Sequence, residues 1–294
     1  MLLWFMAHSI FPFSRHIEDV IGDGYDVKPL QYFYGGWYVF KSNPAAFLSV
    51  TFVFSLVNEA LSHLFSTPSF SGSLRTELFS TLPLEMARLC LFHGVEALML
   101  VCTAVMAWQR LDNRPLSLIT FLKDWRSAGL VLVCAAVMTL VAWTPIMFIT
   151  SLPFVGGALA ARVTLPGIIV LSLIGVALFV SVMVSYAFAY FVLIDRKEGI
   201  WNALEGSRRV VHRHWGKIGG LMLLFMALNV ETYCLLGSAL EMVSPSLGFN
   251  WLCMADMAGG QGVLVLLMLT AIGRALSGCV LAVAYADIYG VSAV

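Results

Sequence analysis

Charged residues are scarce in this sequence. Of its 294 residues, 12% are charged and 60% are hydrophobic, and the mean hydropathy is +0.88. Soluble domains average about 25% charged and about 45–50% apolar residues. A soluble fold of this length has no means of burying so much apolar surface, so lipid has to cover part of it. The composition therefore predicts an integral membrane protein.

A surplus of positive charge is also lacking. Seventeen Lys and Arg residues balance seventeen Asp and Glu residues, so the formal net charge is zero. Proteins that bind nucleic acids carry a basic surplus or a basic stripe. We therefore expect no nucleic-acid partner.

Motifs for catalysis and metal binding are missing as well. The sequence contains no HExxH, no GxSxG, no Walker loop and no GxGxxG. None of the six cysteines belongs to a CxxC or to a Cys/His spacing suited to zinc. Five of them lie inside apolar runs, where a small core side chain is the expected role. The sequence thus indicates no enzyme class, and we expect no catalytic residue, metal or cofactor.

Long apolar runs dominate what is present. A bilayer core of about 30 Å requires about 20 apolar residues per helix. Six runs qualify, at about 45–65, 84–108, 126–150, 167–194, 217–243 and 263–289. Pro44, Pro83 and Pro166 stand just before the first, second and fourth runs, where proline favours a helix start. The sequence predicts an all-α, polytopic fold with six transmembrane helices.

The positions of Lys and Arg predict the orientation of these helices. Basic residues gather in loops on the cytoplasmic side of a membrane. Two of the Lys and Arg residues outside the runs, Arg75 and Arg162, lie on one side of the predicted topology. The other thirteen lie on the opposite side, at positions 15, 28, 41, 110, 114, 123, 126, 196, 197, 208, 209, 213 and 217. Both ends of the chain are therefore expected in the cytoplasm.

Residues 1–43 precede the first run and are rich in aromatic side chains, among them Tyr32, Tyr34, Trp37 and Tyr38. Tyr and Trp favour the headgroup zone of a bilayer, so this segment is expected to lie at the membrane surface. The alternative is an arm that binds other membrane subunits. We divide the chain into this interfacial N-terminal arm, residues 1–43, and a single six-helix transmembrane domain, residues 44–294.

A second segment outside the runs, residues 198–215, has the pattern of a cytoplasmic amphipathic helix. Its apolar residues are Ile200, Trp201, Leu204, Val210 and Val211. The basic residues of the segment and its edge are Arg208, Arg209, His212, Arg213, His214 and Lys217. Such a helix is typically held by anionic lipid headgroups, at about 1 kcal/mol per basic residue. A defined phosphate or headgroup site is the alternative.

The same region carries a family resemblance. It contains Glu198-Gly199, then Ala203-Leu204 and Ser207, and Trp215-Gly-Lys-Ile-Gly-Gly follows before another apolar run. Leu165-Pro-Gly-Ile-Ile opens the preceding run. This pattern resembles the bacterial YciC-like (UPF0259) proteins, the related DUF975 proteins and the membrane domain attached to some glycerophosphodiester phosphodiesterases. The resemblance implies an α-helical protein of the bacterial inner membrane. The long aromatic N-terminus and the acidic residues inside the runs depart from that pattern.

Ionisable residues inside the apolar runs are the candidate site. Each costs about 2.5–3.5 kcal/mol at the centre of a membrane helix, so such residues usually face the bundle interior and pair. Counting residues from the ends of the runs places Glu96 and Arg274 at the same depth, which predicts a buried ion pair. We call the full set the polar seam: Glu59, His63, Arg88, His93, Glu96, Glu231 and Arg274. Either it lines a water-filled cavity or it supplies interhelical hydrogen bonds.

Three functions follow from these patterns. The first is a non-catalytic subunit or scaffold of a membrane assembly, favoured by the aromatic arm and the short loops. The second is a small transporter or lipid-handling protein that uses the polar seam. The third, an intramembrane enzyme, has no supporting motif.

Overall fold

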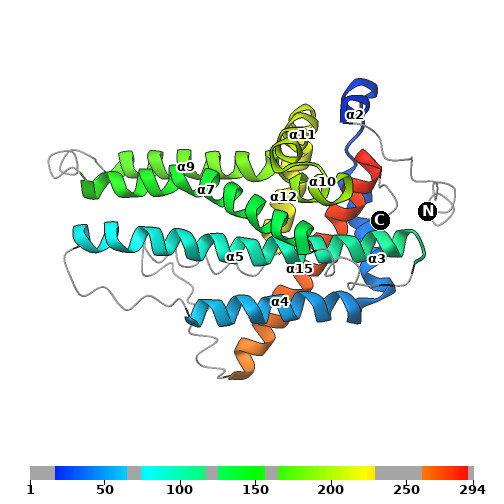
Figure 1. The fold of residues 1–294 in the computed structure, drawn as a ribbon, viewed down its shortest axis with the longest axis horizontal. Helices are drawn as coiled ribbons and strands as arrows, with labels where there is room; N and C mark the ends of the chain where they lie inside the picture. Colours follow the sequence, from blue (N-terminus) through cyan, green and yellow to red (C-terminus); the bar gives the residue numbers. More distant parts are fainter. Residues whose placement is uncertain are drawn as a thin grey trace.

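The computed structural model describes residues 17–64, 74–114, 116, 125–155, 165–228 and 260–290. These residues form helices and no strands (Figure 1). The helices are α2 (Ile17–Asp23), α3 (Pro29–Ser42), α4 (Pro44–Leu64), α5 (Leu74–Leu111), α7 (Trp125–Val155), α9 (Leu165–Ser185), α10 (Ala189–Arg196), α11 (Ile200–Arg213), α12 (Trp215–Leu228) and α15 (Gly260–Tyr289).

Five helices are long and apolar enough to cross a bilayer. The apolar spans are Pro44–Leu61, Met86–Leu111, Trp125–Trp143, Leu173–Arg196 and Leu267–Tyr289. The predicted helix at 217–243 begins as α12, which is apolar from Trp215 to Phe225, and its remainder lies outside the described residues. The chain is therefore an all-helical protein of the multi-pass membrane type.

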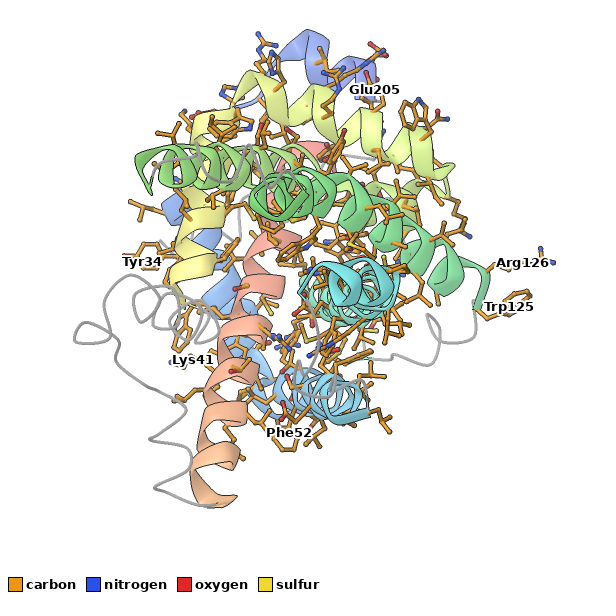
Figure 2. All side chains as sticks on the ribbon, turned by 90° about the vertical axis from the view of Figure 1, so that its left-hand side faces the viewer. Tyr34, Lys41, Phe52, Trp125, Arg126 and Glu205 are labelled. Carbon is orange, nitrogen blue, oxygen red and sulfur yellow. The ribbon has the colours of Figure 1, made fainter. Side chains whose placement is uncertain are left out.

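The long helices run alongside one another, and α15 crosses them obliquely (Figure 1). Seen along the bundle, α5 lies between α7 and α4 (Figure 2), and it packs against both of them and against α15. Helices α2, α10 and α11 gather at one end, which we call the α11 end (Figure 1). The start of α4 and the end of α5 lie toward that same end (Figure 1).

Helix α15 forms the centre of the core. From Thr270 to Tyr289 its side chains are buried, with Ile272 and Asp287 as the two exceptions. It packs on α3, α4 and α5, and small residues allow close contact. A Cβ atom on Gly278 would lie 2.7 Å from Cγ2 of Thr103 on α5, so only glycine fits at this crossing without a shift.

Helix α3 has two faces. Tyr32, Val39 and Phe40 are buried, and Gly36 lies so close to α15 that a Cβ atom there would be 2.6 Å from Cα of Val280. The opposite face is an exposed stripe at helical spacing, formed by Leu30, Tyr34, Trp37 and Tyr38. The buried face makes α3 part of the core, and the predicted location of residues 1–43 at the membrane surface stays a prediction. The boundary at residue 43 stays a prediction.

Two helix boundaries differ from those predicted. Pro83 was expected to precede the second membrane helix, but α5 begins nine residues earlier, at Leu74, and Pro83 lies inside it. Proline removes one backbone hydrogen bond from a helix interior, but it does not prevent a helix from continuing on both sides. The single run predicted at 167–194 is divided into α9 and α10 by a turn at residues 186–188.

Candidate functional site

The ion pair predicted between Glu96 and Arg274 is confirmed. Nη2 of Arg274 on α15 donates to Oε1 of Glu96 on α5 over 2.9 Å. The Arg274 side chain is 8% exposed, so the protein encloses the guanidinium almost completely. Nη1 of Arg274 also donates to Oγ of Ser55 on α4, at 3.3 Å. One guanidinium therefore joins three helices inside the apolar spans.

His93 extends this contact to a fourth helix. One turn before Glu96 on α5, its Nδ1 lies 3.1 Å from Oε2 of Glu96. On the other side of the ring, Nε1 of Trp143 on α7 donates to Nε2 of His93 at 3.1 Å. We call Ser55, His93, Glu96, Trp143 and Arg274 the intramembrane network. Trp143 was not among the predicted site residues, because an aromatic residue in an apolar run gives no sign of its polar partner.

The two hydrogen bonds of His93 define its tautomer. The indole N–H of Trp143 is a donor only, so Nε2 of His93 has to accept. The imidazole then carries its hydrogen on Nδ1, which donates to the Glu96 carboxylate. A protonated ring would direct an N–H at the N–H of Trp143. This geometry fits the tautomer of His93 that carries its hydrogen on Nδ1.

Exposure within the network is uneven. The side chains of His93 and Glu96 are 28% and 35% exposed, whereas that of Arg274 is 8% exposed. Both carboxylate oxygens already accept one hydrogen bond, and each oxygen has a further lone pair. Chemically, the exposed side of the network offers a carboxylate that is able to accept a proton or to bind a cation.

The rest of the polar seam is only partly described. Glu59 on α4 is half-buried, and the guanidinium of Arg88 on α5 lies 5.5 Å from the ring centre of Phe92. The side chain of His63 and the whole of Glu231 lie outside the described residues. The structure thus joins Glu96, His93 and Arg274, and the predicted cavity stays a prediction.

The predicted amphipathic helix is present as α11, Ile200–Arg213. Ala203, Leu204, Val210 and Val211 are buried, and Trp201 is 78% exposed. The cations on its outer side have protein partners. Arg208 and Arg209 both bind Glu205, and Arg209 also binds Glu18 of α2.

Arg213 and Lys217 follow in the chain. Arg213 binds α2, and Lys217 binds the segment between α2 and α3. Nη1 of Arg213 donates to the backbone oxygen of Ile21, and Nζ of Lys217 donates to Oδ1 of Asp26 at 2.8 Å. The ring of His214 contacts Tyr25 edge-on, with the ring centres 4.6 Å apart, and His212 is exposed. These contacts attach α2 to α11. The role of this basic surface in lipid binding stays a prediction.

Charge at the α11 end is therefore largely neutralised by pairing. Hydrogen bonds from Arg208 and Arg209 lower the pKa of Glu205 to about 2. The bond from Lys217 likewise lowers the pKa of Asp26. Both carboxylates remain ionised throughout the physiological pH range, so the pairs persist there.

The residues that carry the family resemblance have structural roles here. The backbone N–H of Phe188, in the turn between α9 and α10, donates to Oγ of Ser207 at 3.2 Å, and that hydroxyl donates to the oxygen of Ser185 at 3.0 Å. Ser207 thus satisfies backbone groups that the helix break leaves without helical partners. Gly206, beside it, leaves room for Ile17 of α2.

Close to this break, the aromatic side chains of Trp108, Phe188, Phe191, Tyr285 and Tyr289 pack together. Within them, the hydroxyl of Tyr285 donates to Oδ2 of the buried Asp195 at 2.9 Å. The indole of Trp108 donates to the backbone oxygen of Ala282 at 3.0 Å. This sealed region joins α5, α10 and α15.

Comparison with models of protein families, with curated proteins and with solved structures finds no match for this chain. Among the described residues, no group of three or more His, Cys, Asp and Glu side chains is arranged to hold a metal ion.

Proposed function

We propose that the protein is a small transporter of the bacterial inner membrane, with six spans and both ends in the cytoplasm, and that the carboxylate of Glu96 binds the transported proton or cation. The observation that supports this function is the exposure of Glu96 inside the apolar spans. A charged group at that depth costs about 2.5–3.5 kcal/mol unless water, a partner or a ligand compensates for it. Arg274 compensates on the enclosed side, and about a third of the Glu96 side chain remains exposed.

The network suggests how binding is controlled. A cation arriving at Glu96 competes with Arg274 for the carboxylate, and Ser55 offers the guanidinium a second acceptor on α4. Because Trp143 keeps the hydrogen of His93 on Nδ1, the imidazole presents a donor to Glu96 rather than competing for the incoming cation. The relation to the YciC-like, DUF975 and phosphodiesterase-linked membrane proteins is part of this proposal.

The test is a flux assay with the full chain in proteoliposomes under an imposed membrane potential. Protons, Na⁺, K⁺ and methylammonium are offered in turn. We expect Glu96→Gln to reduce the flux of the transported ion at least tenfold when the flux is expressed per amount of folded protein. Glu18→Gln removes an exposed carboxylate outside the spans and is the matched control. We expect its flux to equal that of the parent chain.

Two results would contradict transport. One is the absence of flux of any of these ions in the parent chain. The other is an equal loss of folded protein and of flux in Glu96→Gln, which would make the network a purely structural contact.

A subunit or scaffold role is the second candidate, and one observation favours it. The exposed stripe of α3, formed by Leu30, Tyr34, Trp37 and Tyr38, is available to another membrane protein. Because the opposite face of α3 belongs to the core, deletion of the arm would disturb the fold. Leu30→Ser with Tyr34→Ser changes the exposed stripe and leaves the buried Tyr32, Val39 and Phe40 in place. Loss of co-purifying subunits from native membranes, with unchanged melting of the chain, supports this role; unchanged co-purification rejects it.

A further inference from the structure

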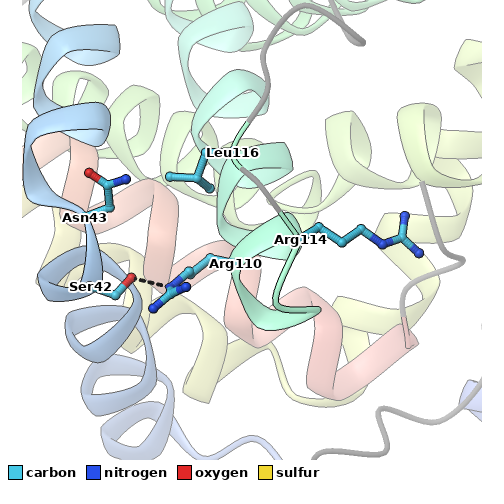
Figure 3. A pocket seen from close by; sticks show the side chains of 5 residues that line it. All are labelled: Ser42, Asn43, Arg110, Arg114 and Leu116. Carbon is cyan, nitrogen blue, oxygen red and sulfur yellow. Dashed lines mark hydrogen bonds between the residues drawn. The ribbon is translucent and has the colours of Figure 1, made fainter.

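A polar cleft lies at the end of the α5 span, away from the intramembrane network. Its volume is about 370 Å³, and its lining residues are Ser42, Asn43, Arg110, Arg114 and Leu116 (Figure 3). Ligand clefts typically measure about 300–1,000 Å³. The apolar span of α5 ends at Leu111, so the cleft is located where the hydrocarbon zone gives way to headgroups.

Arg110 supplies the charge of the cleft. Its Nε donates to Oγ of Ser42 at 2.9 Å, and the Ser42 hydroxyl in turn donates to the backbone oxygen of Val39 at 2.7 Å. Ser42 thereby orients the guanidinium without neutralising it. Among the described residues, no ion pair involves Arg110. This differs from α11, where Arg208 and Arg209 share the carboxylate of Glu205.

Asn43 adds a neutral donor. Its Oδ1 accepts from the backbone N–H of Ala46 at 3.4 Å, which leaves the amide nitrogen free to serve as a donor. Figure 3 shows that this nitrogen is on the side of Leu116, facing the cleft. Asn43 also precedes the first turn of α4, where backbone N–H groups favour a negative charge.

The remaining two lining residues differ in character. Leu116 presents an apolar side chain toward the cleft (Figure 3). The guanidinium of Arg114 points away from Ser42 and Asn43 (Figure 3) and lies 3.8 Å from Oδ2 of Asp112. Arg110 is therefore the residue that concentrates positive charge inside the cleft.

We propose that this cleft binds a phosphate group, carried either by a lipid headgroup or by a soluble ligand. Arg110 provides the charge-assisted hydrogen bonds, Ser42 holds its guanidinium in place, and Asn43 donates a further hydrogen bond. A guanidinium with open donors and a neutral amide donor fits the several acceptor oxygens of a phosphate. An apolar wall beside it accommodates the uncharged part of the same ligand.

Binding of a lipid phosphate is distinguished from binding of a soluble phosphate with the full chain purified in dodecyl maltoside, a detergent without phosphate. In one arm, ³²P-labelled inorganic phosphate is equilibrated with the protein by dialysis. In the other, ³²P-labelled phosphatidic acid in the same micelles is retained on the immobilised protein. Saturable binding in either arm, lost in Arg110→Gln, supports the cleft, and the arm that binds more tightly identifies the source.

We expect Arg110→Gln to weaken binding at least tenfold, because the phosphate loses its hydrogen bonds from a charged donor. Arg110→Lys keeps the positive charge but loses the paired N–H donors of the guanidinium. We expect its affinity to lie between that of the parent chain and that of Arg110→Gln. Lys41→Gln is the matched control, because it removes an exposed cation one residue from Ser42 that does not line the cleft; we expect less than a twofold change. Arg110 is exposed, so its variants fold normally.

The proposal is overturned if the parent chain binds neither probe, or if Lys41→Gln and Arg110→Gln weaken binding equally. Equal weakening by the two variants would show that binding depends on the general surface charge rather than on the cleft. Neither result affects the proposed transport through Glu96, which is measured by ion flux.

Discussion

The intramembrane network and the α11 end both contain polar side chains, but these side chains differ in how far they are exposed. Each connects several helices through polar side chains within a largely apolar protein. At the α11 end, Ser207 and Tyr285 are fully buried and Asp195 is 7% exposed. Ser207 bonds to backbone groups of the helix break, and Tyr285 donates to Asp195. In the network, Glu96 is 35% exposed although it lies within a span. The polar contacts at the α11 end are sealed from the surface, whereas the network keeps a partly exposed carboxylate within a span.

The largest effect is expected from breaking the network at its enclosed side. Arg274→Met leaves the Glu96 carboxylate without its cation, and removing one partner of a buried pair costs about 3–5 kcal/mol. Unfolding by dodecyl sulfate in mixed micelles, followed by tryptophan fluorescence, measures this loss.

The double variant Glu96→Gln with Arg274→Gln replaces the charged pair by two amides. We expect it to recover at least half of the stability lost in Arg274→Met. If the double variant is less stable than Arg274→Met, the pair does not carry the coupling between α5 and α15.

A smaller effect is expected where α3 crosses α15 through a sealed contact. A valine at Gly36 would overlap the backbone of Val280, and overpacking typically costs about 1–3 kcal/mol. Gly220→Val is the matched control, because a Cβ atom there meets open space in a helix of the same length. Equal destabilisation of the two variants would show that helix propensity, rather than the crossing, accounts for the change.

The helix break between α9 and α10 is tested by Ser207→Ala. The N–H of Phe188 then loses its acceptor in a buried place, which costs about 1–3 kcal/mol. Ser277→Ala serves as the control, since within the described residues the Ser277 hydroxyl donates to the Gly273 oxygen of its own helix and not to another helix. Thermal melting of the two variants side by side gives the comparison, and a Ser207→Ala chain as stable as Ser277→Ala would contradict the proposed role.

The smallest effect concerns the attachment of α2 to α11 at high pH. Burial raises the pKa of Tyr25 to about 12, and its hydroxyl donates to the backbone oxygen of Val210. An unfolded tyrosine titrates near pH 10. The contribution of this group is therefore complete below about pH 10 and is lost as the pH rises toward about 12. Tyr25→Phe should melt with a weaker pH dependence than the parent chain over this interval, and identical profiles would refute the assignment.

The sequence was sufficient to predict which charged residues of the network lie at the same depth in the membrane. Glu96 and Arg274 are charges within apolar runs, and counting residues from the ends of those runs was enough to pair them. His93 entered the same set because it is also ionisable. Trp143 did not, since indole is common in membrane helices and its donor role depends on the angle between α5 and α7. Sequence periodicity does not specify that angle.

Close helix crossings were harder to predict. Gly216 and Gly220 form the GxxxG pattern that usually marks such contacts, yet a Cβ atom on either of them meets open space. The crossings occur instead at Gly36 and Gly278, which lie in no such pattern. Their partners, Val280 and Thr103, are far away in the chain, and local sequence carries no information about so distant a surface.

The central position of α15 has a consequence for biosynthesis. Helices α3, α4 and α5 are made early, but the surface on which all three pack is made last among the described helices. Until α15 enters the bilayer, the carboxylate of Glu96 lacks its arginine and Gly36 lacks its neighbour. A ribosome that stops before residue 260 thus releases a chain in which the carboxylate of Glu96 has lost its partner within a span, a cost that the finished protein avoids.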